Sequence, residues 1–330
     1  MRGIRSLVSS PPGTLASVIG VQLDLFGGQH LPRALEGHSS AEAPDASGPQ
    51  LDLFADRHLE LGRARRLLID GRARDAVRAL RELRRRYPDD PVIGAELELA
   101  RVMERRLDAV AAAVPDERAH LLVALARAAP AELRPALLRR AAAALRQSGP
   151  AALLGGKAAS VLLLEAGELD GAHAAAEAAV GASERARFIA YLADVEARRD
   201  LCGLARERYR EALAQDPHDI DWDAIADADV RSLPDIARTE FELEDGVAWS
   251  APVGVLLDVL PLGQPPASSG DGAAEPQRAF AAVDRARRFL AALVRDRREP
   301  GGSVSGARLA ARREMRALAP QLLAAYLASK

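Results

Sequence analysis

Cysteine is almost absent from this chain of 330 residues, since Cys202 is the only one. A single cysteine excludes an internal disulfide framework and a metal site built on several cysteines. Aromatic residues are also scarce, at 4%, while hydrophobic residues reach 48%, so alanine, leucine and valine must form most of the core. Alanine and leucine favour helices, and β-branched residues are sparse through most of the chain. We therefore expect an all-α protein with little or no sheet.

An excess of charge of one sign is missing too. Lysine and arginine together number 45, and aspartate and glutamate 47, which gives a net charge of −2. Domains that bind nucleic acid usually carry a basic excess, so we expect no direct contact with nucleic acid. The two arginine-rich stretches, residues 81–86 and 285–298, contain or adjoin acidic residues and are typical of solvated helix faces.

Long hydrophobic runs are lacking. The longest, residues 251–262, contains Asp258 and is too short to span a bilayer. Near the N-terminus, Pro11 and Pro12 interrupt a mildly apolar stretch, and no small-residue cleavage site follows it, so we expect no signal peptide. The sequence thus predicts a cytoplasmic protein that has no membrane partner.

Composition divides the chain into five segments. Residues 1–49 are rich in Gly, Ser, Pro and Ala without periodicity, which predicts a flexible N-terminal arm. Residues 50–217 show helical periodicity with regular breaks at proline and glycine, which predicts a helical-repeat array joined by tight turns. Residues 218–262 contain both tryptophans, Trp222 and Trp249, and we expect them to cap the open end of the array.

The last two segments are a linker and a helical pair. Residues 263–276 are rich in Gly, Pro and Ser and predict a linker. Residues 277–330 predict a C-terminal helical hairpin, with one helix at about residues 277–298 and another at about 307–329. Pro320 should kink or split the second helix, because proline cannot donate to the helical hydrogen-bond ladder.

Small and large residues recur at helical spacing in the array. The stretch that ends at Pro88 contains Ala64, Leu67, Gly71, Ala76, Leu80 and Leu83. Two further stretches match at the same offsets, with Ser160, Leu163, Gly167, Ala172, Ala176 and Ala179 in one, and Ala193, Ala205, Tyr209, Ala212 and Pro217 in the other. Asp200 stands at the turn position of the last stretch, where the first two have glycine.

This pattern resembles the tetratricopeptide repeat. In that family small residues let two antiparallel helices approach closely, large residues fill the groove between repeats, and the proline ends the second helix. Ser160 and Ala193 are 33 residues apart, close to the family period. The 96 residues between Ala64 and Ser160 leave room for two degenerate repeats, on residues 92–114 and 119–147. The resemblance implies a tetratricopeptide-like α-solenoid of antiparallel helix pairs; an irregular helical bundle is the alternative.

Motifs for nucleotide or acyl chemistry are incomplete. Gly155, Gly156 and Lys157 lack the upstream glycine and the following Ser or Thr of a phosphate-binding loop. Val304 stands where a nucleophile elbow requires serine. We therefore expect no catalytic residue and no cofactor. An enzyme with a cleft between residues 222 and 249, where aromatic side chains could hold a small ligand, is kept as an alternative.

A metal site is not expected either. No two histidines stand four residues apart on a helix. His218, Asp219, Asp221 and Asp223 are close in sequence but lack the glycine and the glutamate of a calcium loop. They instead predict the N-cap and the acidic first turn of a helix that starts near Trp222.

One pentapeptide, Gln-Leu-Asp-Leu-Phe, occurs twice. The first copy consists of Gln22, Leu23, Asp24, Leu25 and Phe26, and the second of Gln50, Leu51, Asp52, Leu53 and Phe54. Both copies resemble the bacterial sliding-clamp-binding motif, which is found in polymerases, mismatch-repair proteins and clamp-associated regulators. In that family the glutamine hydrogen-bonds at the edge of a pocket, and the Leu-Phe pair fills a hydrophobic cleft.

Each copy of the pentapeptide also has another explanation. In the second copy, at the start of the first predicted helix, Leu53 and Phe54 could pack into the array beneath Leu59 and Leu61. The first copy lies in the arm, where a short linear motif is accessible, but it could be a relic of duplication or lie upstream of the real start codon. The sequence predicts a non-catalytic scaffold that binds a protein partner through the repeat surface; the alternative is an accessory protein that binds the sliding clamp in DNA replication or repair.

Overall fold

The computed structural model describes residues 50–263, 278–299 and 305–329. Within these ranges the chain forms fourteen α-helices, one 3₁₀ turn and a two-stranded β-hairpin. The expectation of an all-α protein is therefore confirmed. The abundance of alanine and leucine accounts for this result, because both residues lose little freedom in a helix.

The helices begin and end largely where proline and glycine interrupt the sequence. The first five are α2 (Gln50–Ile69), α3 (Ala73–Arg86), α4 (Pro91–Ala112), α5 (Pro115–Ala128) and α6 (Arg134–Gln147). Strands β1 (Leu153–Leu154) and β2 (Lys157–Ala158) precede α7 (Ala159–Glu165), α8 (Leu169–Ala182), α9 (Ala186–Arg198) and α10 (Cys202–Gln215). The 3₁₀ turn η2 (Pro217–Asp219) precedes α11 (Ala228–Thr239) and α12 (Ser250–Leu256), and α13 (Arg278–Arg298), α14 (Gly306–Leu318) and α15 (Pro320–Ala328) complete the described chain.

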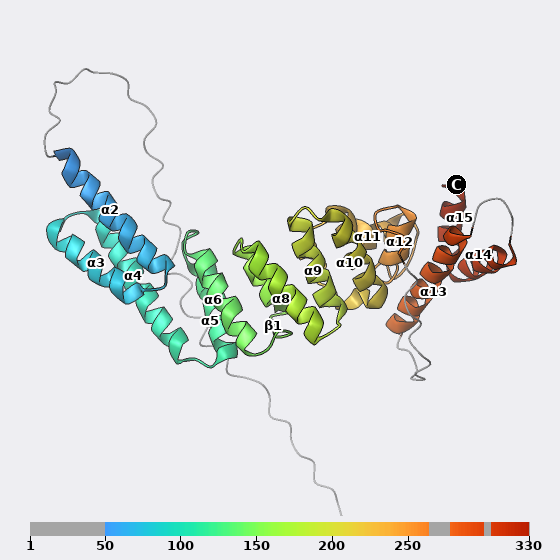
Figure 1. The fold of residues 1–330 in the computed structure, drawn as a ribbon, viewed down its shortest axis with the longest axis horizontal. Helices are drawn as coiled ribbons and strands as arrows, with labels where there is room; N and C mark the ends of the chain where they lie inside the picture. The colour runs from blue at the N-terminus through green and yellow to red at the C-terminus, as the bar shows by residue number, and fades with distance from the viewer. Residues whose placement is uncertain (1–49, 264–277, 300–304, 330) are drawn as a thin grey trace, which may run out of the picture.

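Most helices that follow one another in the chain pack together, and they stand side by side along the long axis of the molecule (Figure 1). Their buried sides form two main hydrophobic clusters. One cluster joins residues from α2 to α9, and the other joins residues from α9 to α15. Helix α9 belongs to both, because Leu192 and Val195 lie in the first cluster and Ala190 and Ala193 in the second.

Three of the turns between paired helices have the same geometry. They join α2 to α3, α7 to α8 and α9 to α10, and their central residues, Gly71, Gly167 and Asp200, have φ values of 70°, 78° and 63°. In each turn the next amide donates to a carbonyl five residues earlier, as Arg72 N does to Leu67 O at 2.7 Å. This left-handed conformation favours glycine, and aspartate is one of the few other residues that adopt it.

The second helices of these three pairs also end in the same way. Each is followed by its C-cap at the same offset from the turn, namely Tyr87, Ser183 and Asp216, and each cap amide donates to the carbonyl four residues earlier. The residues of the sequence pattern that are buried in the three pairs are Ala64, Ala76, Leu80, Leu83, Ser160, Leu163, Ala172, Ala176, Ala179, Ala193, Ala205, Tyr209 and Ala212. The sequence pattern therefore marks three helix pairs with matching turns and matching packed positions.

Three helices, α4, α5 and α6, fill the interval between the first pair and the second. Helix α4 packs against α3, and α5 packs against α6. The interval thus holds a single helix and one pair, so the prediction of two degenerate repeats there was wrong. The physical reason is that neither proline nor, after Gly94, glycine stands between Pro91 and Pro115. The chain therefore continues as one helix of 22 residues where a repeat would require a turn.

The C-terminal helices break at Pro320, as predicted, with α14 ending at Leu318 and α15 beginning at Pro320. Proline suits the first turn of α15, because its missing N–H has no partner to lose there. Helix α13 packs on α12 and α14, and Arg287 Nε of α13 donates to Ala214 O of α10 at 2.7 Å. The C-terminal helices are therefore docked on the rest of the chain.

One buried carboxylate joins the three C-terminal helices. Asp296 of α13 is fully buried. It accepts hydrogen bonds from Arg312 Nε of α14 at 2.8 Å and from Tyr326 OH of α15 at 2.7 Å, and Arg308 Nε of α14 lies 3.8 Å from it. Because an unpaired charge is very unfavourable in such a position, these partners are needed for the carboxylate to be buried at all.

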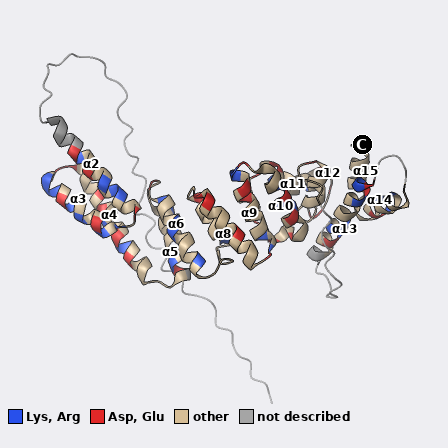
Figure 2. Cartoon of the chain, viewed as in Figure 1, with Lys and Arg blue, Asp and Glu red and all other residues tan. Residues whose placement is uncertain are grey.

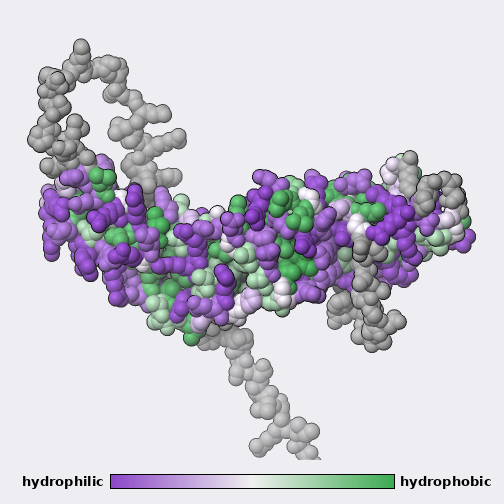
Figure 3. Space-filling model, viewed as in Figure 1, coloured by the Kyte–Doolittle hydropathy of each residue, from purple (hydrophilic) through white to green (hydrophobic). Residues whose placement is uncertain are grey.

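Charge is unevenly distributed along the described chain (Figure 2). Residues 218–263 contain eleven acidic residues and two arginines, a net charge of −9, whereas α3 contains six arginines and two acidic residues. Hydrophilic residues cover most of the face seen in Figure 3, where apolar residues form separate patches. None of the described helices combines the length and the apolar character that crossing a membrane requires.

Candidate functional site

The two pentapeptides are the site residues that the sequence singled out. The first copy, residues 22–26, lies outside the described residues. The second copy, residues 50–54, forms the first part of α2, so its backbone is helical, while its side chains are outside the described part of the structure. Of the two nearby leucines, Leu61 belongs to the core at 6% exposure, but Leu59 is 71% exposed. Packing and clamp binding both stay open as explanations of the second copy.

Helix α9 carries three polar side chains on one of its sides. Arg187, Tyr191 and Asp194 follow one another at intervals of four and three residues, which places them on the same face. Every residue from Phe188 to Glu196 is buried. Helices α8 and α10 pack against α9 on other sides. The polar face is therefore covered by a further part of the chain.

Two segments cover the polar face of α9: the β-hairpin β1–β2, and residues 217–227, which we call the strap. Tyr191 OH donates to Gly156 O of the hairpin at 2.8 Å and lies 3.3 Å from Asp221 Oδ2 of the strap. Arg187 also contacts both segments, since its Nη1 donates to Gly156 O at 3.3 Å and its Nε to Asp219 O at 2.7 Å. These two residues of α9 hold the hairpin and the strap together.

The loop of the β-hairpin consists of Gly155 and Gly156 alone. The strands pair as Leu153 with Ala158 and Leu154 with Lys157, and the two glycines between them have φ values of 55° and 86°. Two successive residues with positive φ are the requirement of a type I′ turn, and glycine meets it without steric cost. The Gly-Gly-Lys stretch, which failed the test for a phosphate loop, is thus a hairpin turn.

Asp194 makes the third contact between α9 and the strap. Its Oδ1 accepts hydrogen bonds from Ala226 N at 2.8 Å and from the hydroxyl of Tyr209 on α10. The residue is 3% exposed. Burial raises the pKa of Asp194 to about 7, against the lowering effect of these two hydrogen bonds. The group that holds the strap to α9 and α10 therefore titrates near neutral pH.

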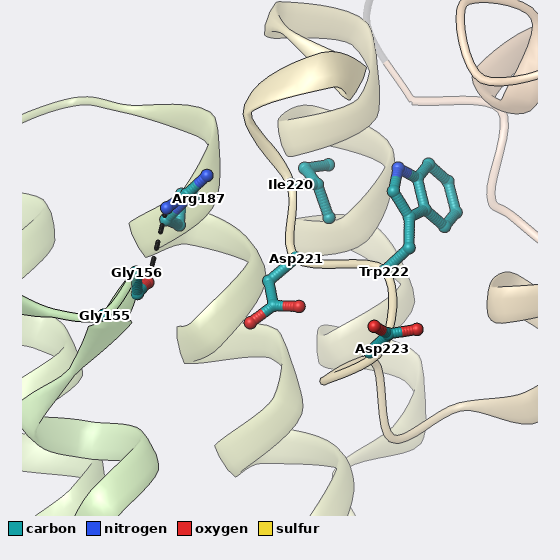
Figure 4. Close-up of a pocket in the computed structure, with 7 residues that line it drawn as sticks. All are labelled: Gly155, Gly156, Arg187, Ile220, Asp221, Trp222 and Asp223. Carbon is teal, nitrogen blue, oxygen red and sulfur yellow. Dashed lines mark hydrogen bonds between the residues drawn. The ribbon is translucent and has the colours of Figure 1, made fainter. Parts of the chain in front are cut away.

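A pocket of about 400 Å³ opens where the hairpin and the strap meet over α9 (Figure 4). Figure 4 shows Arg187, bonded to Gly156 of the hairpin, on one side of the pocket, and the strap residues on the other side. Its lining residues are Gly155 and Gly156 of the hairpin, Arg187 of α9, and Ile220, Asp221, Trp222 and Asp223 of the strap. The pocket is the candidate binding site of the described chain.

The strap corrects one prediction. A helix was expected to start near Trp222, with the residues before it as cap and first turn, but α11 starts at Ala228, and Asp227 is its N-cap. Asp219 and Asp221 contact α9, so tertiary hydrogen bonds keep the strap out of a helix. Within the described residues, no group of three or more His, Cys, Asp or Glu side chains is placed to hold a metal ion.

The two tryptophans have different environments. Trp249 is 3% exposed and packs edge-to-face on Phe289, with ring centroids 5.8 Å apart, so it belongs to the core. Trp222 is half-buried, donates from Nε1 to Pro217 O at 3.1 Å, and lines the pocket. Of the two, only Trp222 is placed to meet a ligand.

No family model, no curated protein and no solved structure matches this chain. The class of protein is therefore defined by the fold and the site alone. It is an elongated all-α protein of side-by-side helices, with a polar pocket where a β-hairpin and a strap meet over one buried helix.

Proposed function

We propose that this protein is a non-catalytic scaffold of the tetratricopeptide-like kind, which binds a protein partner on the surface of residues 50–217. One observation carries the proposal: three helix pairs share their turn geometry and their buried positions at offsets of 96 and 33 residues. Stacked helix pairs create the extended surfaces that repeat proteins use for binding. A cytoplasmic location and the absence of a cofactor are part of the proposal.

Selection from a displayed library of random peptides tests the scaffold. The whole folded chain is immobilised, enriched peptides are measured by calorimetry, and a photo-crosslinker on each peptide maps its place on the chain. We expect a family of related peptides that bind with micromolar affinity and crosslink within residues 50–217 or to the adjoining strap. The heat-denatured chain serves as the control and should bind none of them. A folded chain that enriches no related peptides would contradict the proposal.

The repeated pentapeptide favours a second function, recruitment to the bacterial sliding clamp in DNA replication or repair. Two apolar anchors and one amide on a short segment suit a hydrophobic groove. Two copies on one chain, residues 22–26 and 50–54, would also raise the overall affinity where both can bind at once.

Calorimetry with the purified sliding clamp tests this second function on the wild type, Phe26→Ala, Phe54→Ala and the double variant. We expect micromolar binding by the wild type and a loss of about a hundredfold in the double variant, because truncating a buried aromatic anchor costs about 2–4 kcal/mol. Leu59→Ala, which truncates an exposed apolar residue next to the second copy, is the matched control. A wild type that does not bind, or a folded double variant that binds as the wild type does, would exclude the clamp.

A further inference from the structure

Arg187 is the one positively charged residue among those that line the pocket. Its guanidinium is already engaged, because Nε donates to Asp219 O, Nη1 donates to Gly156 O, and the Asp219 carboxylate lies 3.6 Å from Nε. A phosphate or carboxylate ligand would reach only the remaining N–H groups of Arg187 and would meet the carboxylates of Asp221 and Asp223 beside them. An anionic ligand therefore does not fit the pocket.

Two carboxylates dominate the charge of the pocket. Asp221 is half-buried, with the Tyr191 hydroxyl near one of its oxygens, and Asp223 is exposed. Among the described residues, Asp223 has no hydrogen-bond or ion-pair partner. Asp219 is shared between Arg185 and Arg187. The lining itself holds Asp221 and Asp223 against Arg187 alone, so it carries a net negative charge. Trp222 adds an aromatic side chain, and an indole also attracts cations through its ring face.

The surroundings of the pocket strengthen this preference. The strap begins an acidic part of the described chain, since residues 218–263 have a net charge of −9. Four of its carboxylates, Asp219, Asp227, Asp229 and Asp258, pair with arginines elsewhere in the chain, and the others supply the excess of negative charge. A surface of one sign raises the local concentration of ligands of the other sign and speeds their association. The pocket and the surface around it therefore select for the same class of ligand, one with positive charge.

We propose that this pocket binds a cationic side chain, arginine or lysine, of the partner polypeptide. The inference rests on the proposed scaffold function and adds to it the type of side chain that is recognised and the place where it binds. The volume of about 400 Å³ lies in the range of small-ligand sites. The partner is thus a protein with a basic segment, and one basic residue of that segment enters between the hairpin and the strap.

Short Gly/Ser peptides with one central residue are the probes for this test. The central residue is arginine, lysine or citrulline, which keeps the shape of arginine without its charge. The whole chain is titrated with each peptide, and the NMR signals of the Trp222 indole N–H and of the Gly155 and Gly156 amides are followed. We expect the arginine and lysine peptides to shift these signals and the citrulline peptide to bind at least about tenfold more weakly.

Three variants locate the charge that matters. Asp223→Asn changes an exposed residue that has no hydrogen-bond or ion-pair partner among the described residues, so the fold should be unaffected. Asp221→Asn keeps an oxygen for Tyr191 OH. Each should weaken the arginine peptide by about fivefold to tenfold. Glu244→Gln is the matched control, because it removes the same charge from an exposed residue of the acidic segment that does not line the pocket. It should change the affinity by less than about twofold.

The outcomes separate this inference from the scaffold function. Equal binding of the arginine and citrulline peptides, shifts that avoid the pocket, or equal effects of Glu244→Gln and Asp223→Asn would overturn the cationic site. In that case, library peptides that still bind within residues 50–217 independently of Asp223 would leave the scaffold standing. If the pocket binds the arginine peptide but the chain enriches no library peptide, the scaffold function is excluded and the cationic site stands.

Discussion

Replacing Asp296 by alanine is expected to destabilise the protein by about 3–5 kcal/mol. The carboxylate is fully buried and accepts hydrogen bonds from Arg312 and Tyr326, and Arg308 Nε lies 3.8 Å away. Without it, two guanidinium groups lose their counter-charge, and the Tyr326 hydroxyl loses its acceptor in a residue that is 1% exposed. The large effect thus comes from the partners that are left behind more than from the bond that is lost.

Urea denaturation followed by circular dichroism measures this loss, and hydrogen exchange locates it. Exchange should rise first in α14 and α15. Among the contacts described for these helices, those of Asp296 are the buried charged ones that join α14 and α15 to α13. Asp284→Ala is the matched control, since it is an exposed carboxylate on the same helix and should cost less than about 0.5 kcal/mol. A folded Asp296→Ala protein as stable as the Asp284→Ala protein would show that the carboxylate is dispensable.

Stability is expected to fall by up to about 4 kcal/mol as the pH rises from about 4 to about 7, through the titration of Asp194. Burial raises the pKa of Asp194 from 3.8 to about 7. Between these values the folded chain binds more protons than the unfolded chain, so raising the pH favours unfolding. Above about pH 7 the carboxylate is charged in both states and the loss is complete.

Asp194→Asn isolates this effect from all other titrating groups. Asparagine keeps Oδ1 as an acceptor for Ala226 N and Tyr209 OH but carries no charge. Urea denaturation should therefore find the variant close to the wild type below about pH 4 and more stable by a few kcal/mol at pH 8. Asp223→Asn, which removes an exposed carboxylate of the same strap, is the matched control. A difference between Asp194→Asn and wild type that stays constant with pH would mean that Asp194 does not titrate in this range.

The helix pairs were foreseeable from sequence because their determinants are local. A left-handed turn needs glycine or a residue that tolerates positive φ, and a close helix pair needs small side chains at fixed offsets. Asp200 made the last turn uncertain, yet its φ of 63° matches the 70° of Gly71. The expected all-α class followed from the same local preferences, summed over the chain.

The strap and the pocket were not foreseeable, because distant residues determine them. From sequence, Asp219 and Asp221 predict the first turn of a helix. In the structure they instead contact Arg187 and Tyr191 of α9, which are about 30 residues earlier in the chain. One local signal did exist: Gly155 and Gly156 between two apolar residues and a short following strand are typical of a tight hairpin.

Glu196 is a core residue whose environment could not be predicted from the sequence. It stands at the position that Leu67 and Leu163 occupy in the other two pairs, and it is 2% exposed. Burial raises the pKa of Glu196, while Arg208, whose Nε lies 4.0 Å from one carboxylate oxygen, opposes that shift. A pattern of apolar positions predicts leucine here, because the compensating arginine comes from the neighbouring helix α10.

Helix α9 has a consequence for how the molecule unfolds. Repeat proteins often melt in stages, because each unit depends only on its neighbours. Here one helix of 13 residues contributes side chains to both main hydrophobic clusters. Melting α9 opens the two cores together, so it couples the folding of the two ends of the described chain and makes their transitions cooperative.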